Sequence, residues 1–418
     1  MKTRFNTFCR WLFIICALRS TCFAQPLQAP TDYYNFINYN VDTLYIANDN
    51  PAFFQFFIAK LDTVVTQKRG NINIVHIGGS HVQAGTFPNT VRQLFQMAYP
   101  DLKAGRGMIF PYAAAPKCNN PVDYRTRSVG RFGLVRNVYH EHTKPLGVTG
   151  IAVYTLDSVS EVKIVKRDSV TTFNTSQITL LGYTTHDSTF VPRLIIDTAT
   201  FLPTKIIPEK RRFVYENICV TDSFSFYLAT KDSDSFTITG ILLANEEPGI
   251  TYHSIGVNGA SVDAFLRCEH FEEEIELLSP DMVIFGLGIN DASEADYNPA
   301  VFKENYLTLV RRFIKVNPNC FFVFITNNDS YKKVGKKYQV NKNALKVRTI
   351  MYELADETGG AVFDQFEIMG GLQSMEKWRL ENLAQKDRVH FTKAGYELMG
   401  KLLFNAIIKE LEKRLQLH

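Results

Sequence analysis

The stretch Asn-Ile-Val-His-Ile-Gly-Gly-Ser-His, residues 73–81, decides the fold class of this 418-residue chain. A short apolar run that two glycines stop is typical of a buried strand that feeds a tight turn. The same layout recurs at residues 282–287, 320–325 and 361–363, where each apolar run is followed by polar residues. These four runs predict buried strands whose ends all carry polar side chains.

Amphipathic stretches separate the predicted strands. Apolar residues recur at spacings of three and four through residues 261–278, 299–316, 340–357 and 398–411, and helices are also expected near 51–65 and 86–98. Strands that alternate with helices predict an α/β fold, in which a parallel sheet forms the middle of three layers. In such sheets the functional residues gather beyond the carboxyl ends of the strands.

The middle of the chain differs from the rest in composition and residue pattern. Residues 112–243 are rich in Val, Thr, Ile, Phe and Tyr in short alternating runs, with turn residues between them and no helical periodicity. This pattern predicts an antiparallel β-sandwich. We therefore expect residues 25–110 and 245–418 to form the two parts of one α/β domain, with residues 111–244 as an inserted β-domain.

The net charge of +4 comes entirely from the first 24 residues, which contain four basic residues and no acid. The rest of the chain has 42 basic and 42 acidic residues and is formally neutral, so composition gives no support for a nucleic-acid partner.

Residues 1–24 have the features of a secretory signal peptide: a charged start, an apolar stretch at 11–18 and a small-x-small sequence at 22–24. About eight apolar residues are too few to span a bilayer, which needs roughly 20. A lipoprotein signal through Cys22 is the weaker alternative, because Arg19-Ser20-Thr21 is a poor lipobox. We expect export to the periplasm or the extracellular space, with no transmembrane segment in the mature chain.

Four cysteines follow this segment, and no two form a C-x-x-C pair: Cys118, Cys219, Cys268 and Cys320. Their spacing argues against a metal cluster and leaves disulfides and free thiols both open.

Three polar clusters carry candidate chemistry. The first is Ser80, on the glycine turn after a strand, where a hydroxyl can lie close to backbone N–H groups that bind an oxyanion. The second is Asn290, after the run at 282–287, where a carboxamide is a suitable oxyanion donor. The alternatives are a glycine turn with an incidental serine and an Asx turn, respectively.

The third cluster is Asp387-Arg388-Val389-His390. A separation of three residues lets one local turn bring the carboxylate to the imidazole, where it fixes the tautomer and stabilises the imidazolium. The alternative is a solvated turn before a helix that Thr392 caps.

The other histidines have simpler interpretations. His76 lies inside an apolar strand and is expected to be a hydrogen-bonded core residue, whereas His81 is expected to shape the pocket. His140 and His142 have no acids at ligand spacing. We therefore expect no metal site and no organic cofactor.

Taken in order, the clusters resemble the SGNH (GDSL-type) hydrolase family, whose motif blocks run Ser, Gly, Asn and Asp-x-x-His. The resemblance covers about residues 70–110 and 245–410. It implies Ser80 as nucleophile, His390 as general base and acid, and Asp387 as the residue that orients His390. It also implies oxyanion donors at the Ser80 N–H, the Gly259 N–H and the Asn290 side chain. Gly259 is preferred to Gly256 because it directly precedes the helix expected from Ser261.

Within the family, Gly-Ser-His at the nucleophile, Gly-Val-Asn-Gly-Ala at 256–260 and a β-domain between the first two blocks resemble the peptidoglycan O-acetylesterases. The resemblance implies a secreted serine esterase that removes O-acetyl groups from an acylated carbohydrate, with peptidoglycan as the candidate. One residue departs from the family pattern: Gly79 replaces the Asp that usually precedes the serine and helps to hold the nucleophile loop. The expectation is that Gly79→Asp leaves activity intact or raises it.

Two alternatives stay open at this point. An O-acyltransferase would use the same residues with a sugar hydroxyl in place of water. A non-catalytic glycan-binding protein on a relic hydrolase fold would be consistent with Gly79, although Ser80, Asn290, Asp387 and His390 are all present.

Overall fold

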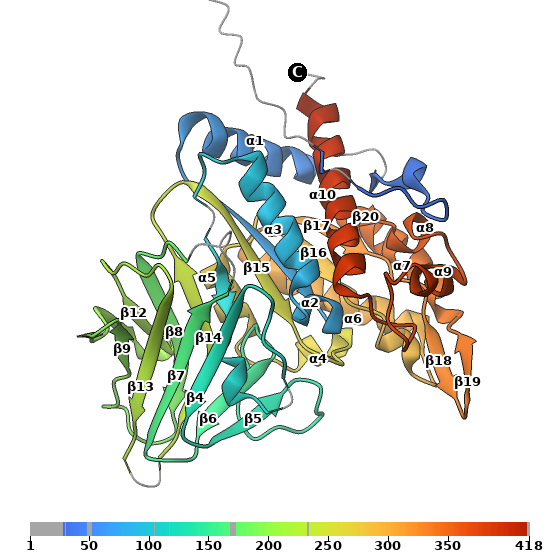
Figure 1. Ribbon diagram of the computed structural model, residues 1–418. Helices are drawn as coiled ribbons and strands as arrows, with labels where there is room; N and C mark the ends of the chain where they lie inside the picture. Colours follow the sequence, from blue (N-terminus) through green and yellow to red (C-terminus); the bar gives the residue numbers. More distant parts are fainter. Residues whose placement is uncertain are drawn as a thin grey trace, which may run out of the picture.

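The computed structural model describes residues 28–29, 31–47, 52–103, 105–116, 118–167, 173–231 and 234–415. The predicted signal segment, residues 1–24, lies outside the described residues. The described chain contains a mixed α/β unit and a β-rich unit side by side (Figure 1).

A six-stranded sheet forms the centre of the α/β unit, and five of its strands are parallel, as the alternating pattern predicts. The sequence predicted four of the parallel strands; the edge strands β15, which is parallel, and β1, which is antiparallel, were not expected. In spatial order the strands are β1 (Leu44–Ile46), β20 (Ala361–Phe363), β17 (Phe321–Ile325), β16 (Met282–Gly286), β2 (Asn71–Gly78) and β15 (Gly249–Gly256).

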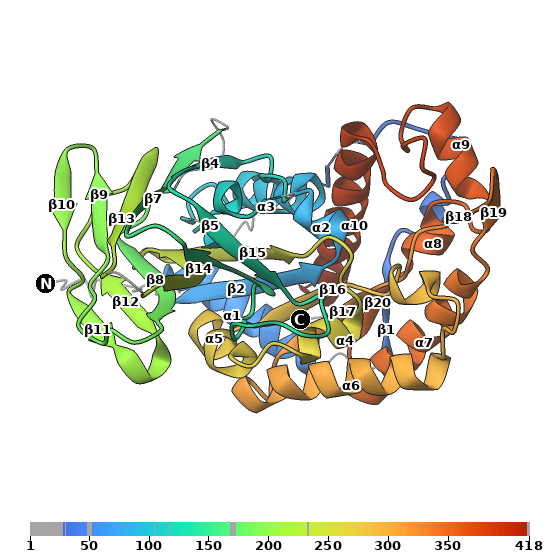
Figure 2. The same cartoon turned by 90° about the horizontal axis from the view of Figure 1, so that it is seen from below.

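Helices cover both faces of this sheet. The helices of the α/β unit are α1 (Ala52–Gln67), α2 (Ser80–Gln83), α3 (Thr86–Ala98), α4 (Val262–Leu266), α5 (Phe271–Leu278), α6 (Pro299–Val316), α7 (Asn343–Thr358), α8 (Gln365–Ile368), α9 (Ser374–Leu380) and α10 (Lys393–Leu415). Along β16, Met282 and Ile284 belong to the buried cluster of α1, α3 and α10, whereas Val283 and Phe285 belong to that of α5, α6 and α7. Figure 2 shows α3 and α10 on one side of the sheet and α6 on the other. The three-layer prediction is confirmed.

Two helix predictions need correction. The stretch 261–278 forms two helices instead of one, because Leu146 and the segment 267–270 exchange hydrogen bonds: the N–H of His270 donates to the Leu146 carbonyl (2.9 Å), and the N–H of Leu146 donates to Glu269 Oε2 (2.9 Å). The helix expected from Val340 begins at Asn343, because residues 331–340 form the hairpin β18 (Tyr331–Val334) and β19 (Lys337–Val340).

The β-rich unit consists of two antiparallel sheets, in agreement with the expected insert. One sheet has the order β10-β9-β13-β7-β4, and the other has β11-β12-β8-β14-β6-β5 with β3 also paired to β14. The strands are β3 (Gly107–Ile109), β4 (Tyr124–Val129), β5 (Phe132–Arg136), β6 (Ile151–Thr155), β7 (Val159–Lys166), β8 (Gln177–Thr184), β9 (Arg193–Ile196), β10 (Ala199–Phe201), β11 (Lys205–Ile207), β12 (Arg212–Tyr215), β13 (Ser223–Ala229) and β14 (Phe236–Ala244). Because β3 pairs with β14, the inserted sheet begins before the expected boundary at residue 111.

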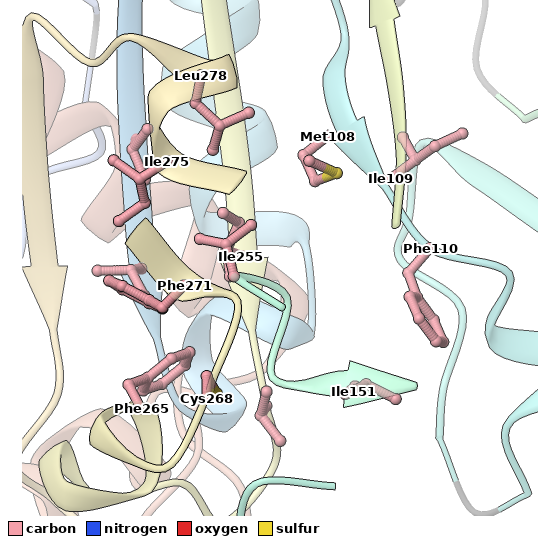
Figure 3. Close-up of a cluster of buried hydrophobic side chains, with 14 of the residues drawn as sticks. Met108, Ile109, Phe110, Ile151, Ile255, Phe265, Cys268, Phe271, Ile275 and Leu278 are labelled. Atoms are coloured by element: carbon pink, nitrogen blue, oxygen red, sulfur yellow. The ribbon is translucent and has the colours of Figure 1, made fainter. Parts of the chain in front are cut away.

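The two units share one hydrophobic core. Met108 and Ile151 of the insert belong to the same buried cluster as Ile255 of β15 and Phe265 of α4 (Figure 3). Burying a side chain of this size contributes about 1.5–3 kcal/mol to stability. Glu274 of α5 adds polar contacts, because its carboxylate accepts hydrogen bonds from the N–H of Val148 (2.8 Å) and the hydroxyl of Thr239 (2.7 Å). The insert is therefore packed firmly on the α/β unit.

All four described cysteines, Cys118, Cys219, Cys268 and Cys320, are free thiols. Among the described helices, none combines the length and apolar character needed to cross a membrane.

Candidate active site

The turn after β2 presents Ser80 at the carboxyl edge of the parallel sheet. Gly78 is confined here, since a Cβ at this position would lie 2.4 Å from Val82 Cγ2 and 2.8 Å from the Gly286 carbonyl oxygen. The Gly79 carbonyl accepts hydrogen bonds from the N–H groups of Val82 (3.2 Å) and Gln83 (3.0 Å). The chain therefore turns at once into the short helix α2, of which Ser80 is the first residue.

The structure brings Ser80, His390 and Asp387 into one hydrogen-bonded chain. Ser80 Oγ lies 2.8 Å from His390 Nε2, and His390 Nδ1 lies 2.7 Å from Asp387 Oδ2. The other Asp387 oxygen, Oδ1, accepts hydrogen bonds from the N–H groups of Val389 (2.9 Å) and His390 (3.0 Å). Partial burial would raise the pKa of Asp387, but the hydrogen bonds from His390 and Val389 prevail and lower it to about 2. Asp387 is thus ionised wherever His390 can act as a base.

The residues expected to bind an oxyanion meet beside this chain. The amide Nδ2 of Asn290 donates to the Ala260 carbonyl (2.8 Å), next to Gly259, whose φ of +83° is in the region that favours glycine. Within the described part of the chain, the N–H groups of Ser80 and Gly259 have no hydrogen-bond partner. The N–H of Val257 donates to the Gly78 carbonyl (3.1 Å), which ties the Gly259 segment to the turn that carries Ser80.

Asp291 fastens the segment of Asn290 to the segment of Gly259, a contact that the sequence did not predict. Its Oδ1 accepts a hydrogen bond from the N–H of Val262 (3.1 Å), at the start of α4. Burial raises the pKa of Asp291 to about 7. Asn290 and the segment before α4 are therefore held together by a buried carboxyl as well as by the bond from Asn290 to Ala260.

Residues that follow β17, the strand next to β16, form hydrogen bonds to the loop that carries His390. Asn328, just after β17, donates from Nδ2 to the Val389 carbonyl (3.0 Å). The N–H of Tyr331 donates to the carbonyl of Arg388 (3.1 Å), and Arg388 pairs with Glu376 of α9 (2.7 Å). The sequence showed Asn328 as one of several polar residues after a strand but gave no sign of this contact.

The remaining histidines lie as expected near the core or the loops. His76 is fully buried, its Nδ1 is 2.9 Å from the Tyr252 hydroxyl, and burial lowers its pKa to about 3. His81 Nδ1 is 2.9 Å from the Tyr396 hydroxyl, and its ring lies 5.2 Å from that of His390. Burial, together with the nearby His390, lowers the pKa of His81 to about 3, so this ring stays neutral beside His390.

In the insert, His142 Nε2 lies 3.0 Å from Glu269 Oε1. No group of three or more His, Cys, Asp or Glu side chains is placed to hold a metal ion within the described ranges.

Gly79 lies close to the side chain of Asn290. A Cβ at Gly79 would lie 3.1 Å from Asn290 Nδ2, so a side chain there requires Asn290 to move by a few tenths of an ångström. This close approach is a physical reason for glycine at position 79, where the family usually has Asp.

Comparisons with known proteins agree with this geometry. Residues 228–398 match the GDSL-like lipase/acylhydrolase family, a range that includes Asn290, Asp387 and His390 and begins after Ser80 because the insert separates the first motif block from the rest. No curated protein matches the sequence.

A solved structure described as a peptidoglycan O-acetylesterase in action has the same fold. It is 20% identical, with a TM-score of 0.71 over 88% of this chain and 99% of that chain. An Enterococcus faecalis lipase/acylhydrolase is 22% identical (TM-score 0.31) over 40% of this chain and 77% of that chain. An acetyl xylan esterase is 19% identical (TM-score 0.30) over 38% of this chain and 80% of that chain. Residues 228–398 thus match the GDSL-like lipase/acylhydrolase family, and the chain has the fold of the structure described as a peptidoglycan O-acetylesterase; together these findings support a carboxylic ester hydrolase.

Proposed function

We propose that this protein is an exported serine esterase that removes O-acetyl or other short acyl groups from a carbohydrate, with Ser80, His390 and Asp387 as its catalytic triad. The observation that carries the proposal is the hydrogen-bonded chain from Ser80 Oγ through His390 to Asp387 at the carboxyl edge of the sheet. A hydroxyl, an imidazole and a carboxylate in this order are the arrangement that activates serine for acyl transfer.

In the first step Ser80 Oγ attacks the ester carbonyl carbon, and its proton passes to His390 Nε2. The N–H groups of Ser80 and Gly259 and the amide of Asn290 stabilise the negative charge on the carbonyl oxygen. The bond to the sugar oxygen then breaks, His390 protonates that oxygen, and the acyl group stays on Ser80. Water attacks the acyl-enzyme and His390 accepts the proton of the water. The bond between Ser80 Oγ and the acyl carbon then breaks, His390 gives its proton to Ser80 Oγ, and the carboxylic acid leaves.

A carbohydrate substrate is supported by the solved structure described as a peptidoglycan O-acetylesterase, which aligns over the insert as well as the α/β unit. Export is supported by the charged start and apolar stretch of residues 1–24. Both agree with an ester-bearing polymer of the cell envelope as substrate.

The test is acetate release from O-acetylated peptidoglycan and from neutral acetylated polysaccharides by the wild type and by Ser80→Ala. The proposal predicts release by the wild type and none by Ser80→Ala, which should fold normally. Equal release by both proteins would contradict the assignment of Ser80. An added glycan acceptor separates hydrolysis from transfer, because acetylated acceptor as the main product would identify an acyltransferase instead.

A further inference from the structure

The hairpin β18–β19, residues 331–340, concentrates positive charge beside the loop that carries His390. Residues 330–352 contain six lysines and one arginine but no acid, although the chain after residue 24 is formally neutral. Within the hairpin, Lys333, Lys336 and Lys337 are exposed. No ion pair reaches any of these three among the described residues. The hairpin projects from the body of the protein near α9 and the start of α10 (Figures 1 and 2).

The base of the hairpin is fastened to the loop that carries His390. The Arg388 guanidinium lies 4.4 Å from the ring centroid of Tyr338 and 5.6 Å from that of Tyr331, and the N–H of Tyr331 donates to the Arg388 carbonyl (3.1 Å). Lys333 pairs directly with Tyr338 across the two strands. Since directly paired residues share one face of a two-stranded sheet, Lys333 lies on the face that holds Arg388.

The base of the hairpin is also fastened to the loop that carries Asn290. Asn341, directly after β19, donates from Nδ2 to the Ala292 carbonyl (3.1 Å), and Lys332 Nζ donates to the Glu294 carbonyl (3.4 Å). The acids on this loop are Asp291, which binds the N–H of Val262, and Glu294 and Asp296. Glu294 contacts Lys332 at the base of the hairpin through its carbonyl, and none of the three acids forms an ion pair with the lysines at the tip among the described residues. The hairpin therefore stands between the oxyanion segment and the base segment with its cationic tip free.

We infer that the hairpin β18–β19 is a subsite for an acidic glycan, in which Lys333, Lys336 and Lys337 bind carboxylates of the polymer whose ester lies at Ser80. The inference rests on the proposed function and adds the charge class of its substrate. The base of the hairpin is bonded to the loops that carry His390 and Asn290, so a polymer whose ester lies at Ser80 is long enough to extend to the hairpin. Lysine is a point charge on a flexible stem, which suits carboxylates that are spaced irregularly along a chain.

The test compares two triple variants that lose the same charge. One is Lys333→Gln with Lys336→Gln and Lys337→Gln. The control replaces the exposed Lys103, Lys205 and Lys315 by Gln. Lys103 and Lys315 lie at the amino ends of the parallel strands, away from Ser80, and Lys205 lies in the insert. The substrates are soluble O-acetylated peptidoglycan fragments, the same fragments with their carboxylates converted to amides, and p-nitrophenyl acetate.

The hairpin variant should raise KM for the acidic fragments roughly tenfold with kcat unchanged, since three exposed ion pairs are lost. It should match the wild type on the amidated fragments and on p-nitrophenyl acetate, and the control should match the wild type throughout. The preference of the wild type for acidic fragments should also decrease between 0.1 M and 1 M salt, because the Debye screening length shortens from about 10 Å to about 3 Å.

Three outcomes would overturn the inference while leaving the proposed function intact: an unchanged KM in the hairpin variant, an equal rise in the control, or binding of anionic vesicles in place of acidic fragments. Failure of the wild type to cleave p-nitrophenyl acetate would overturn the proposed function and the inference with it.

Discussion

Replacing Asp387 by Asn tests the triad more strictly than removing it, because the structure dictates how the new amide must sit. Asp387 Oδ1 accepts from the two N–H groups of Val389 and His390, whereas Oδ2 faces His390 Nδ1. Only the amide oxygen of Asn can accept from two N–H groups, so the amide nitrogen must face His390 Nδ1. It then donates to Nδ1 and forces the ring proton onto Nε2, the atom that must accept the proton of Ser80.

The expected loss in kcat is about 10⁴-fold, which corresponds to about 5.4 kcal/mol in the activation barrier, since the base is held in the wrong tautomer. The loop contacts survive, so the unfolding temperature should change by no more than about 2–4 °C. The assay is steady-state hydrolysis of p-nitrophenyl acetate, with calorimetry as the check on folding.

Asp387→Ala is the matched control, because it removes the carboxylate without placing a donor against Nδ1. The nearly isosteric Asn variant should be no more active than the Ala variant. A kcat for Asp387→Asn within tenfold of the wild type, or well above that of Asp387→Ala, would refute the tautomer argument.

Three further predictions follow from the site and the core. Asn290→Ala should lower kcat roughly 100- to 1000-fold, the usual loss for one oxyanion donor, and a change below fivefold on p-nitrophenyl acetate would argue against that role. Asn328→Ala should lower kcat while KM stays near the wild-type value, since the freed Val389 carbonyl lets His390 drift; an equal effect on KM and kcat would point to substrate binding instead. Glu274→Gln should stabilise the protein at pH 8 by roughly 3 kcal/mol and by much less at pH 5. Burial raises the pKa of Glu274 from 4.5 in the unfolded chain to about 7 in the folded protein. The stability that Glu274 gives the wild type is therefore fully present below pH 4.5 and is lost as the pH rises through 7, whereas the Gln variant has no such loss. Equal unfolding curves for both proteins at pH 8 would contradict this.

The sequence was informative where the determining interactions are local. The strands at residues 282–286, 321–325 and 361–363 are buried apolar runs, and burial on both faces produces that pattern without help from the rest of the fold. The bond between Asp387 and His390 spans three residues, so one turn suffices to form it. By contrast, Ser80 and His390 are 310 residues apart, and only the order of the motif blocks suggested that they meet.

The sequence failed where distant contacts decide local structure. Apolar residues continue in phase across 267–270, yet hydrogen bonds to Leu146 of the insert divide the helix there. The hairpin at 331–340 alternates lysines with few apolar residues, so it carries no buried pattern that would mark it as two strands. Asn328 and Asp291 act through contacts with segments about 30 to 60 residues away, which a single sequence does not reveal.

The central claim is that Ser80 forms an acyl-enzyme when His390 takes its proton. Mass spectrometry of the protein after rapid acid quench from an acetyl ester tests it most directly. The account predicts an acetyl group on Ser80 in the wild type and none in Ser80→Ala or His390→Ala. Acetylation at another residue, or hydrolysis by Ser80→Ala at the wild-type rate, would contradict it.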